Sequence, residues 1–261
     1  MINALKNVLF AIIPDSFLFR LKKIHYLRKI RRTKAEDEDD LCMVRNIICS
    51  GDEALDIGAN IGVYTRFLSQ FAGPGGKVYS FEPVPETFAF LENNVRKLKL
   101  KNVRLLNMAV SDATGMVKME VPRYEKAGDN FYEARIVTIP SGNLKSYDVE
   151  CSTLDNLYSG YGFRPSFIKC DVEGFEWNVF KCSGKLLNEC RPALLVEINH
   201  DLSRPDTRTN ELLKFLKQSG YETYIKQEKQ LKAWQGEKRV NYYFLLKEHL
   251  SNLKAKDLIE E

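Results

Sequence analysis

The chain has 261 residues, of which 44% are hydrophobic, and it carries a formal net charge of +4. The length suits one large domain with an appendage, and the composition is ordinary for a globular protein. The net charge is too small to indicate nucleic-acid binding by itself, so we do not expect nucleic acid as a partner. The six cysteines form no C-x-x-C pair and no recognisable disulfide or zinc pattern. This favours a reducing compartment and predicts a cytoplasmic protein.

The N-terminal segment, residues 1–40, has an uneven distribution of charge. Residues 1–34 contain nine Lys and Arg and a single acid, Asp15, whereas Glu36–Asp40 is a run of five acids. The only long apolar run, Val8–Ile13, is far shorter than the roughly 20 residues that span a bilayer. Apolar residues recur at helical spacing beside the basic ones, which predicts a basic amphipathic helical extension.

Two interpretations of this extension stay open. It can pack on the following domain with its basic face in solvent, which is the interpretation we prefer. It can also make peripheral contact with an anionic membrane on the cytoplasmic face, through residues 1–34. The apolar residues concerned are Leu5, Val8, Leu9, Ile12, Ile13, Phe17, Leu18, Leu21, Ile24 and Leu27.

After a helix over 41–49, the chain alternates between strands and helices. The sequence predicts strand, helix, strand, helix and strand, in that order, over 54–57, 63–72, 77–81, 85–100 and 103–107. This alternation predicts a parallel sheet with right-handed crossovers.

The pattern changes after position 107. A strand over 116–121 and a returning strand over 149–152 enclose a polar segment, 122–147, that is rich in Gly, Pro and Asn. So long a connection is usually functional, and we expect it to cover the carboxyl edge of the sheet on the substrate side. Its aromatic rings could stack on sugar faces and its polar side chains could bond ring hydroxyls; these residues are Arg123, Tyr124, Asn130, Phe131, Tyr132 and Arg135.

The second half of the domain repeats the alternation of strand and helix. Two final strands then follow without a helix between them, so they should pair antiparallel. The predicted elements are 166–171, 173–182, 192–198, 207–219, 221–227 and 241–247. The expected fold is therefore α/β, with a seven-stranded, mostly parallel sheet and an antiparallel C-terminal strand. The domain is expected over 41–249, followed by a charged tail over 250–261.

A glycine-rich turn follows the first predicted strand of the domain. Its pattern is D-x-G-x-N-x-G, from Asp56 through Gly58 and Asn60 to Gly62, and Glu82 ends the next strand. The G-x-G-x-x-G pattern of a dinucleotide fold is missing, and a carboxylate at Asp56 would repel a pyrophosphate but suits a cationic ligand. A carboxylate at Glu82 can accept both hydroxyls of a ribose. These five residues predict an S-adenosylmethionine site, with the glycines allowing close approach of the backbone.

Ser111 and Asp112 follow the third predicted strand, where a sheet of this type binds the adenine edge. We expect Asp112 to bind the adenine amino group. Ser-Asp-Ala-Thr-Gly is also good turn chemistry, so a purely structural role stays open.

Five segments occur in order along the chain: Asp56–Gly62, Phe81–Glu86, Asn107–Asp112, Thr153–Asp155 and Ile168–Glu176. With these segments, the chain closely resembles the FkbM-like family of S-adenosylmethionine-dependent methyltransferases over about residues 51–200. The resemblance implies a class I, Rossmann-like methyltransferase fold. It also implies methyl transfer, commonly to a hydroxyl oxygen of a sugar or natural product, without identifying the acceptor.

An alcohol acceptor needs a base or a metal to take its proton. Asp171 and Glu173 follow the fourth strand of the predicted sheet and His200 follows the fifth, at the edge where active sites collect. We predict these three residues as catalytic. Asp171 and the nearby Glu197 could also ligate magnesium. The structural alternatives are that Asp171 caps the next helix and that His200 is a surface-loop residue.

The leading prediction is an O-methyltransferase for a small-molecule or glycan acceptor. The alternatives are a methyltransferase for nucleic acid or lipid, and a nicotinamide-dependent oxidoreductase on a similar fold. The sequence has no Asn/Asp-Pro-Pro-Tyr segment for amino-group methylation and no Pro-Cys nucleophile for cytosine. The basic N-terminus keeps the nucleic-acid alternative open. The sequence determines neither the oligomeric state nor the metal dependence.

Overall fold

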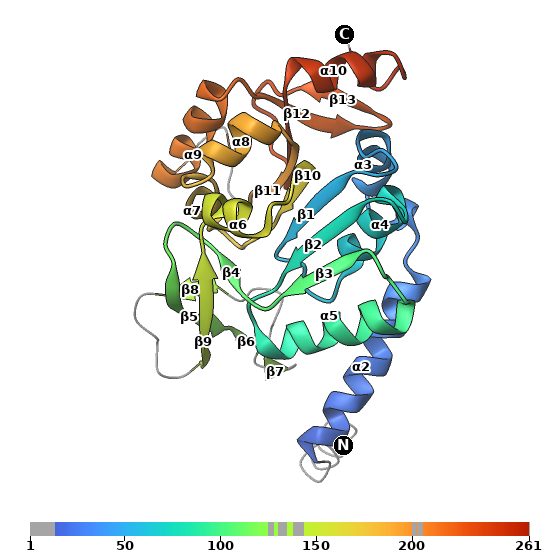
Figure 1. Cartoon of the computed structure of the whole chain (residues 1–261), viewed down its shortest axis with the longest axis vertical. Coiled ribbons are helices and arrows are strands. Elements are labelled where there is room, and N and C mark those ends of the chain that lie inside the picture. Colours follow the sequence, from blue (N-terminus) through green and yellow to red (C-terminus); the bar gives the residue numbers. More distant parts are fainter. Residues whose placement is uncertain are drawn as a thin grey trace.

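The structure is a computed structural model that describes residues 14–124, 128–129, 135–137, 144–199, 202 and 206–260. Figure 1 shows a central sheet between two layers of helices, with a smaller sheet beside it. One helix, α2 (Asp15–Arg32), projects from the body. This layered arrangement confirms the expected α/β fold class.

The main sheet has eight strands within the described residues. Their order is β13 (Gln230–Ala233), β12 (Glu222–Gln227), β14 (Asn241–Leu245), β11 (Ala193–Glu197), β10 (Pro165–Cys170), β1 (Glu53–Ile57), β2 (Lys77–Phe81) and β3 (Val103–Leu106). The five strands from β11 to β3 are parallel, and β14 is antiparallel to both of its neighbours. Seven strands match the expected sheet. The eighth, β13, lies where the sequence predicts a polar loop, and it forms because Leu231 is buried while β13 pairs with β12.

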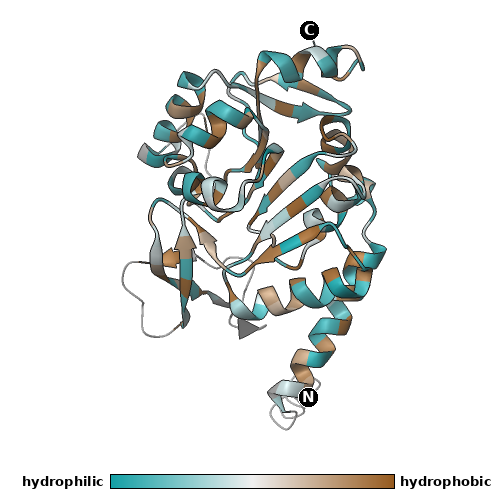
Figure 2. Cartoon of the chain, in the orientation of Figure 1, coloured by the Kyte–Doolittle hydropathy of each residue, from teal (hydrophilic) through white to brown (hydrophobic). Residues whose placement is uncertain are grey.

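Helices cover both faces of this sheet (Figure 1). After the short 3-10 helix η1 (Ala35–Asp37), one face carries α3 (Leu41–Ile47), α4 (Val63–Ala72), α5 (Pro85–Leu98) and α10 (Lys247–Lys254). The other face carries α6 (Leu154–Tyr161), α7 (Glu176–Phe180), α8 (Gly184–Cys190) and α9 (Thr207–Gln218). Figure 2 shows hydrophobic residues along the strands between these layers, which form the core.

Two segments differ from the sequence expectation. The helix expected from 173 begins only at Glu176, because Glu173 and Gly174 take positive φ values of 53° and 91° and form a turn. The segment expected as a charged tail instead contains most of α10, and it buries Leu253 and Ile259 against the sheet. The apolar residues of the segment, and not its charge, decide its place.

The segment after β3 forms a second sheet and a two-stranded ribbon. The second sheet has the order β4 (Ala109–Val110), β9 (Lys145–Ser152), β5 (Gly115–Val121) and β8 (Arg135–Val137), and the ribbon is β6 (Arg123–Tyr124) with β7 (Gly128–Asp129). Val121 and Val149 bury one face of the second sheet against Val84, next to the end of β2. The polar segment 122–147 is therefore built on a folded sheet, and from here on we call residues 109–152, which include the strands of this sheet, the insertion. The residues expected to contact sugars lie outside the described residues, either whole or by their side chains: Arg123, Tyr124, Asn130, Phe131, Tyr132 and Arg135.

Helix α2 packs on α5, as the packed interpretation of the N-terminal extension expects. The ring centroids of Phe19 and Tyr26 lie 4.7 Å and 4.9 Å from that of Phe90. Ile30 is buried, and the Arg66 guanidinium on α4 donates hydrogen bonds to the carbonyls of Ile30 and Thr33. In the part of the chain that the structure describes, no helix is long and apolar enough to cross a bilayer.

Candidate active site

Asp56 supports the loop after β1 from inside the protein. Its carboxylate is fully buried, and Oδ2 accepts a hydrogen bond of 2.6 Å from the Thr65 hydroxyl. Its Oδ1 has no hydrogen-bond partner among the described residues. Burial raises the pKa of Asp56, while Lys169 and Thr65 act to lower it. Asp56 therefore holds the loop from beneath, and it is not among the residues that line the pocket described below.

Gly58 and Gly62 are required by packing, in addition to the ligand approach that the sequence suggests. Gly58 has a φ of 79°, and a Cβ at this position would lie 1.8 Å from the carbonyl oxygen of Asp171. Gly62 has a φ of 95°, and its Cβ would lie 2.6 Å from Leu91 Cδ1. Gly58 lines the pocket described below, whereas Gly62 begins α4 and does not.

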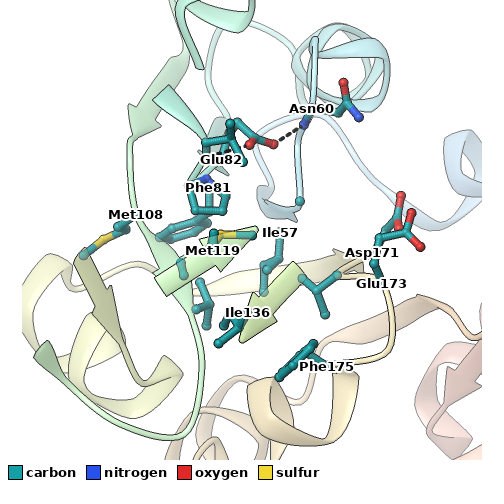
Figure 3. Close-up of a pocket in the computed structure, with 16 residues that line it drawn as sticks. Ile57, Asn60, Phe81, Glu82, Met108, Met119, Ile136, Asp171, Glu173 and Phe175 are labelled. Atoms are coloured by element: carbon teal, nitrogen blue, oxygen red, sulfur yellow. Dashed lines mark hydrogen bonds between the residues drawn. The ribbon is translucent and has the colours of Figure 1, made fainter. Parts of the chain in front are cut away.

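Glu82 is held in place by two backbone amides. Its Oε2 accepts from the Asn60 N–H and its Oε1 from the Val84 N–H, both at 2.9 Å. Figure 3 shows the bond to Asn60, whose φ of 50° is uncommon for a residue other than glycine. Burial raises the pKa of Glu82 to about 7, although the two amides lower it. Each oxygen keeps a second lone pair, so both hydroxyls of a ribose can be accepted.

A pocket that is open to solvent lies between these loops and the second sheet. Glu82 and Asn60 line it on one side (Figure 3). Met119 from β5 and Ile136 from β8 line it from the insertion. The apolar lining also includes Ile57, Phe81, Met108, Val110 and Phe175. An apolar slot beside a fixed carboxylate suits the adenine and ribose of an adenosyl group.

Asp171 and Glu173 line a separate, polar part of the same pocket, with their carboxylates close together (Figure 3). With Glu197 they form a cluster whose nearest carboxylate oxygens all lie within 4.8 Å of one another. Asn199 Nδ2 donates to Glu173 Oε2 at 3.1 Å. Burial and the nearby charge of Asp171 raise the pKa of Glu197. We call Asp171, Glu173 and Glu197 the carboxylate cluster.

Lys169 supplies the positive charge beside this cluster. Its ammonium lies 2.8 Å from Asp171 Oδ2, and its side chain is only 7% exposed. The ammonium also lies 5.1 Å from the centroid of the Tyr64 ring, and Lys169 pairs with Asp56 in the register of β10 with β1. Burial lowers the pKa of Lys169, but Asp171 and Asp56 outweigh it and raise the pKa. Lys169 is therefore a fixed cation that links the turn from Asp56 to Gly62, which we call the glycine loop, to the carboxylate cluster.

The carboxylate cluster has the donor chemistry of a magnesium site, because carboxylate oxygens are the ligands that this ion prefers. The Lys169 ammonium already neutralises part of the cluster, since it pairs with Asp171. A divalent ion would therefore have to share Asp171 with a buried cation.

Three residues predicted to bind the cofactor, Asp56, Gly62 and Asp112, are not among the residues that line the pocket, and a fourth predicted site residue, His200, is not described. Asp112 points to Lys181, and although burial acts to raise its pKa, hydrogen bonds from Lys181 and Asn178 hold that pKa at about 2. It is not among the residues that line the pocket, so the structure does not place it at the adenine edge. His200 lies outside the described residues.

Sequence reasoning missed several residues that build the site. Lys169 is a charged residue within an otherwise apolar strand, next to Asp56 in the sheet, and this placement is the signal that could have found it. Met119 and Ile136 gave no signal, because ordinary strand residues become pocket residues only through the packing of the second sheet.

Comparison with known proteins identifies the family. The family model described as "Methyltransferase FkbM domain" matches residues 56–223, which is more than half of the chain. The chain belongs to the FkbM methyltransferase family. The matched region includes the glycine-rich turn from Asp56 to Gly62 and Glu82.

Individual relatives of this FkbM-family chain are distant. The 31-O-demethyl-FK506 methyltransferase FkbM of Streptomyces tacrolimicus is 37% identical over 82 residues, which is 31% of each chain. The hexuronic acid methyltransferase AglP of Haloferax volcanii is 26% identical over 163 residues, or 62% of each chain. These matches span less than two thirds of either relative. A crystal structure of a methyltransferase FkbM from Methylobacillus flagellatus has a TM-score of 0.49 at 14% identity, covering 85% of this chain and 59% of that one.

Proposed function

We propose that the protein is an O-methyltransferase that methylates a hydroxyl group of a sugar, glycan or small natural product. The observation that carries the proposal is the pair of carboxylates, Asp171 and Glu173, in the same pocket as the apolar slot and Glu82. A hydroxyl group needs a base for transfer, and carboxylates beside the acceptor position provide one.

The pocket fits S-adenosylmethionine as the methyl donor. Glu82 would accept the ribose hydroxyls, and the slot with Met119 and Ile136 would enclose the adenine. Asp56 is fully buried and does not line the pocket, so it would support the loop rather than contact the ligand. When bound, this cofactor supplies a methyl group that is already activated as a sulfonium, so the protein mainly has to align the acceptor.

The carboxylate cluster would orient the acceptor hydroxyl and take its proton. During methyl transfer, Asp171 or Glu173 would take the proton that the acceptor hydroxyl loses. Asn199 orients Glu173 and Lys169 orients Asp171, which keeps both carboxylates in place. His200 remains a prediction for this step.

Magnesium is the alternative to a carboxylate base. The spacing of the cluster favours it, and the Lys169–Asp171 pair opposes it. We propose the carboxylate base, because one of the three ligands is already paired with a cation inside the protein.

The acceptor class rests on the names of distant relatives. One relative is named for 31-O-demethyl-FK506 and another for hexuronic acid, which are both oxygen-rich molecules. These names support a sugar or natural-product hydroxyl over nucleic acid or lipid. The family match leaves no support for the nicotinamide-dependent alternative.

The decisive experiment measures product mass. The protein is incubated with S-adenosylmethionine and separate pools of uronic acids and other sugars, glycans, polyketides, lipids and RNA. We expect one methyl group to be added to an oxygen of a sugar or natural product, and the Glu173→Gln variant to lose this product while still binding S-adenosylhomocysteine. Methylation of RNA alone, or of a nitrogen atom, would contradict the proposal.

A further inference from the structure

Helix α2 carries two apolar stripes. The inner stripe contains Phe19, Tyr26 and Ile30, and it contacts Phe90 of α5 as described above. The outer stripe contains Phe17, Leu21 and Ile24, whose side chains are 51%, 46% and 48% exposed. At about 100° per residue, the three residues of each stripe fall on one side of the helix, and the two stripes are centred roughly 165° apart. The outer stripe therefore points away from the domain.

Positive charge borders the outer stripe. Arg28 lies one turn beyond Ile24, on the same side of the helix as the outer stripe. Arg20, Arg31 and Arg32 flank the stripe at helical spacing. All four arginines are exposed. From residue 16 to residue 35 the sequence contains no Asp or Glu. The outer face of α2 is thus a narrow apolar strip bordered by four arginines.

The inner stripe makes this face a rigid part of the domain. The Arg66 guanidinium donates hydrogen bonds to the Ile30 and Thr33 carbonyls at the end of α2. Ile30 also shares a buried cluster with Ile61 of the glycine loop. Figure 1 shows α2 projecting at the end of the molecule opposite α10, and Figure 2 shows hydrophobic residues among hydrophilic ones along its length. One side of α2 thus packs on the domain, and the opposite side is exposed to solvent.

We propose that the outer face of α2 binds the surface of an anionic lipid bilayer. Half-exposed Phe, Leu and Ile side chains can enter the boundary between headgroups and acyl chains, and arginines beside them pair with lipid phosphates and carboxylates. A protein partner fits this face poorly, because stable protein interfaces bury roughly 1,200–2,000 Å². A single convex helix face with three apolar side chains offers much less.

The consequence for the enzyme is a fixed orientation on the membrane. Because the C-terminal end of α2 contacts the glycine loop through Ile61, binding of α2 to a membrane would hold the pocket at a set distance from the bilayer. This proposal does not depend on the identity of the methyl acceptor.

The test is co-sedimentation of the full chain with vesicles. One set contains two parts phosphatidylcholine and one part phosphatidylserine, and the other contains phosphatidylcholine alone. We expect binding to the mixed vesicles, weak binding to the neutral ones, and loss of binding as salt rises. The triple variant Phe17→Gln, Leu21→Gln, Ile24→Gln should bind at least about tenfold more weakly. Met116→Gln, which changes a 65% exposed side chain on the insertion, is the apolar control and should bind as the unchanged chain does.

A second pair of variants tests the charges. The double variant Arg28→Gln, Arg31→Gln should weaken binding roughly thirtyfold, at about one kcal/mol for each charge near an anionic surface. The double variant Lys217→Gln, Lys247→Gln removes the same charge from exposed positions in α9 and α10, and should have little effect. Equal melting temperature and S-adenosylhomocysteine affinity in all variants will show that the fold is intact.

Three results would overturn the proposal. The first is equal sedimentation of the triple variant and the unchanged chain. The second is equal binding to neutral and anionic vesicles. The third is a concentration-dependent dimer that the triple variant abolishes without any vesicle binding, because the outer face would then bind a second copy of the chain.

Discussion

Gly58 and the carbonyl oxygen of Asp171 are in such close contact that no side chain fits between them. A Cβ on Gly58 would lie 1.8 Å from that oxygen. The Asp171 N–H donates to the Ile57 carbonyl at 3.0 Å, just before Gly58. The glycine loop that borders the pocket and the loop that carries Asp171 are therefore in direct backbone contact, so a change in one should shift the other.

This contact predicts that Gly58→Ala damages the protein. The methyl group would collide with backbone, and the φ of 79° is strained for alanine, so we expect a loss of at least about 1–3 kcal/mol of stability and of S-adenosylhomocysteine binding. Gly160→Ala is the matched control, because Gly160 lies in α6 with open space around it. That change should be neutral or stabilise by up to about 1 kcal/mol. Thermal melts measure the stability of both variants, and calorimetry measures their affinity for S-adenosylhomocysteine. Normal affinity in Gly58→Ala would show that the close contact with Asp171 is not needed for binding.

The pKa of Glu82 predicts a pH dependence of cofactor binding. The raised pKa of about 7 means that Glu82 is largely ionised above neutral pH and gains a proton below it. Only the carboxylate accepts two ribose hydroxyls, so the bound form has the lower pKa, and affinity should fall as pH falls below about 7. The fall approaches tenfold per pH unit.

Calorimetry with S-adenosylhomocysteine from about pH 8 to about pH 6 checks this dependence. Glu82→Gln should weaken binding by about 1–3 kcal/mol at the higher pH and flatten the pH profile. Glu92→Gln, an exposed change on α5, should keep both affinity and slope. A flat profile for the unchanged chain would show that Glu82 does not control binding.

We predict that the insertion contributes to cofactor binding through Met119. This side chain is 5% exposed and lines the pocket from β5, and its truncation should remove apolar contact with the adenine. We expect Met119→Ala to weaken S-adenosylhomocysteine binding by about 1–2 kcal/mol. Met116→Ala, three residues earlier on the exposed face of β5, should have no effect. Equal affinities of the two variants would show that the insertion does not contribute to cofactor binding through Met119.

Lys169 should be essential to the fold near the site. Lys169→Met leaves the buried Asp56 carboxylate and the partly exposed Asp171 carboxylate without their cation, and the expected loss is up to about 3–5 kcal/mol, the range for removing one partner of a buried pair. Lys118→Met breaks the exposed pair with Asp148, where the two side chains are 46% and 62% exposed, and should cost less than about 1 kcal/mol. Chemical denaturation compares the free energies of unfolding of the two variants. Similar losses would show that Lys169 stabilises the fold no more than an exposed cation does.

The sequence predicts the elements where the pattern is periodic and local. The helix over 63–72 and the strand over 77–81 are found at the predicted residues, because glycines and apolar runs mark their ends. It misses β13 and α10, since single buried residues such as Leu231 and Leu253 decide them through contacts made only in the folded chain. The same reason explains the site: Glu82 follows a recognisable strand, whereas Lys169 and Met119 depend on how separate strands pack.

The carboxylate cluster predicts how catalysis responds to mutation and to metal removal. Glu173→Gln and Asp171→Asn keep the size of each side chain but remove the base, so the rate of methyl transfer should fall roughly a hundredfold to ten-thousandfold. The affinity for S-adenosylhomocysteine should stay near normal in Glu173→Gln, because the Glu82 side of the pocket is unchanged. Asp148→Asn changes an exposed carboxylate on the insertion and should keep full activity.

Excess chelator separates the two forms of this chemistry. If a carboxylate takes the proton while Lys169 neutralises Asp171, activity should not change when EDTA is added to the unchanged chain. Loss of activity with EDTA and recovery with magnesium would show that the cluster acts through a metal ion, because an ion that shares the three carboxylates would then supply the activation of the hydroxyl. Near-normal turnover in both Glu173→Gln and Asp171→Asn, with or without chelator, would remove the cluster from the reaction altogether.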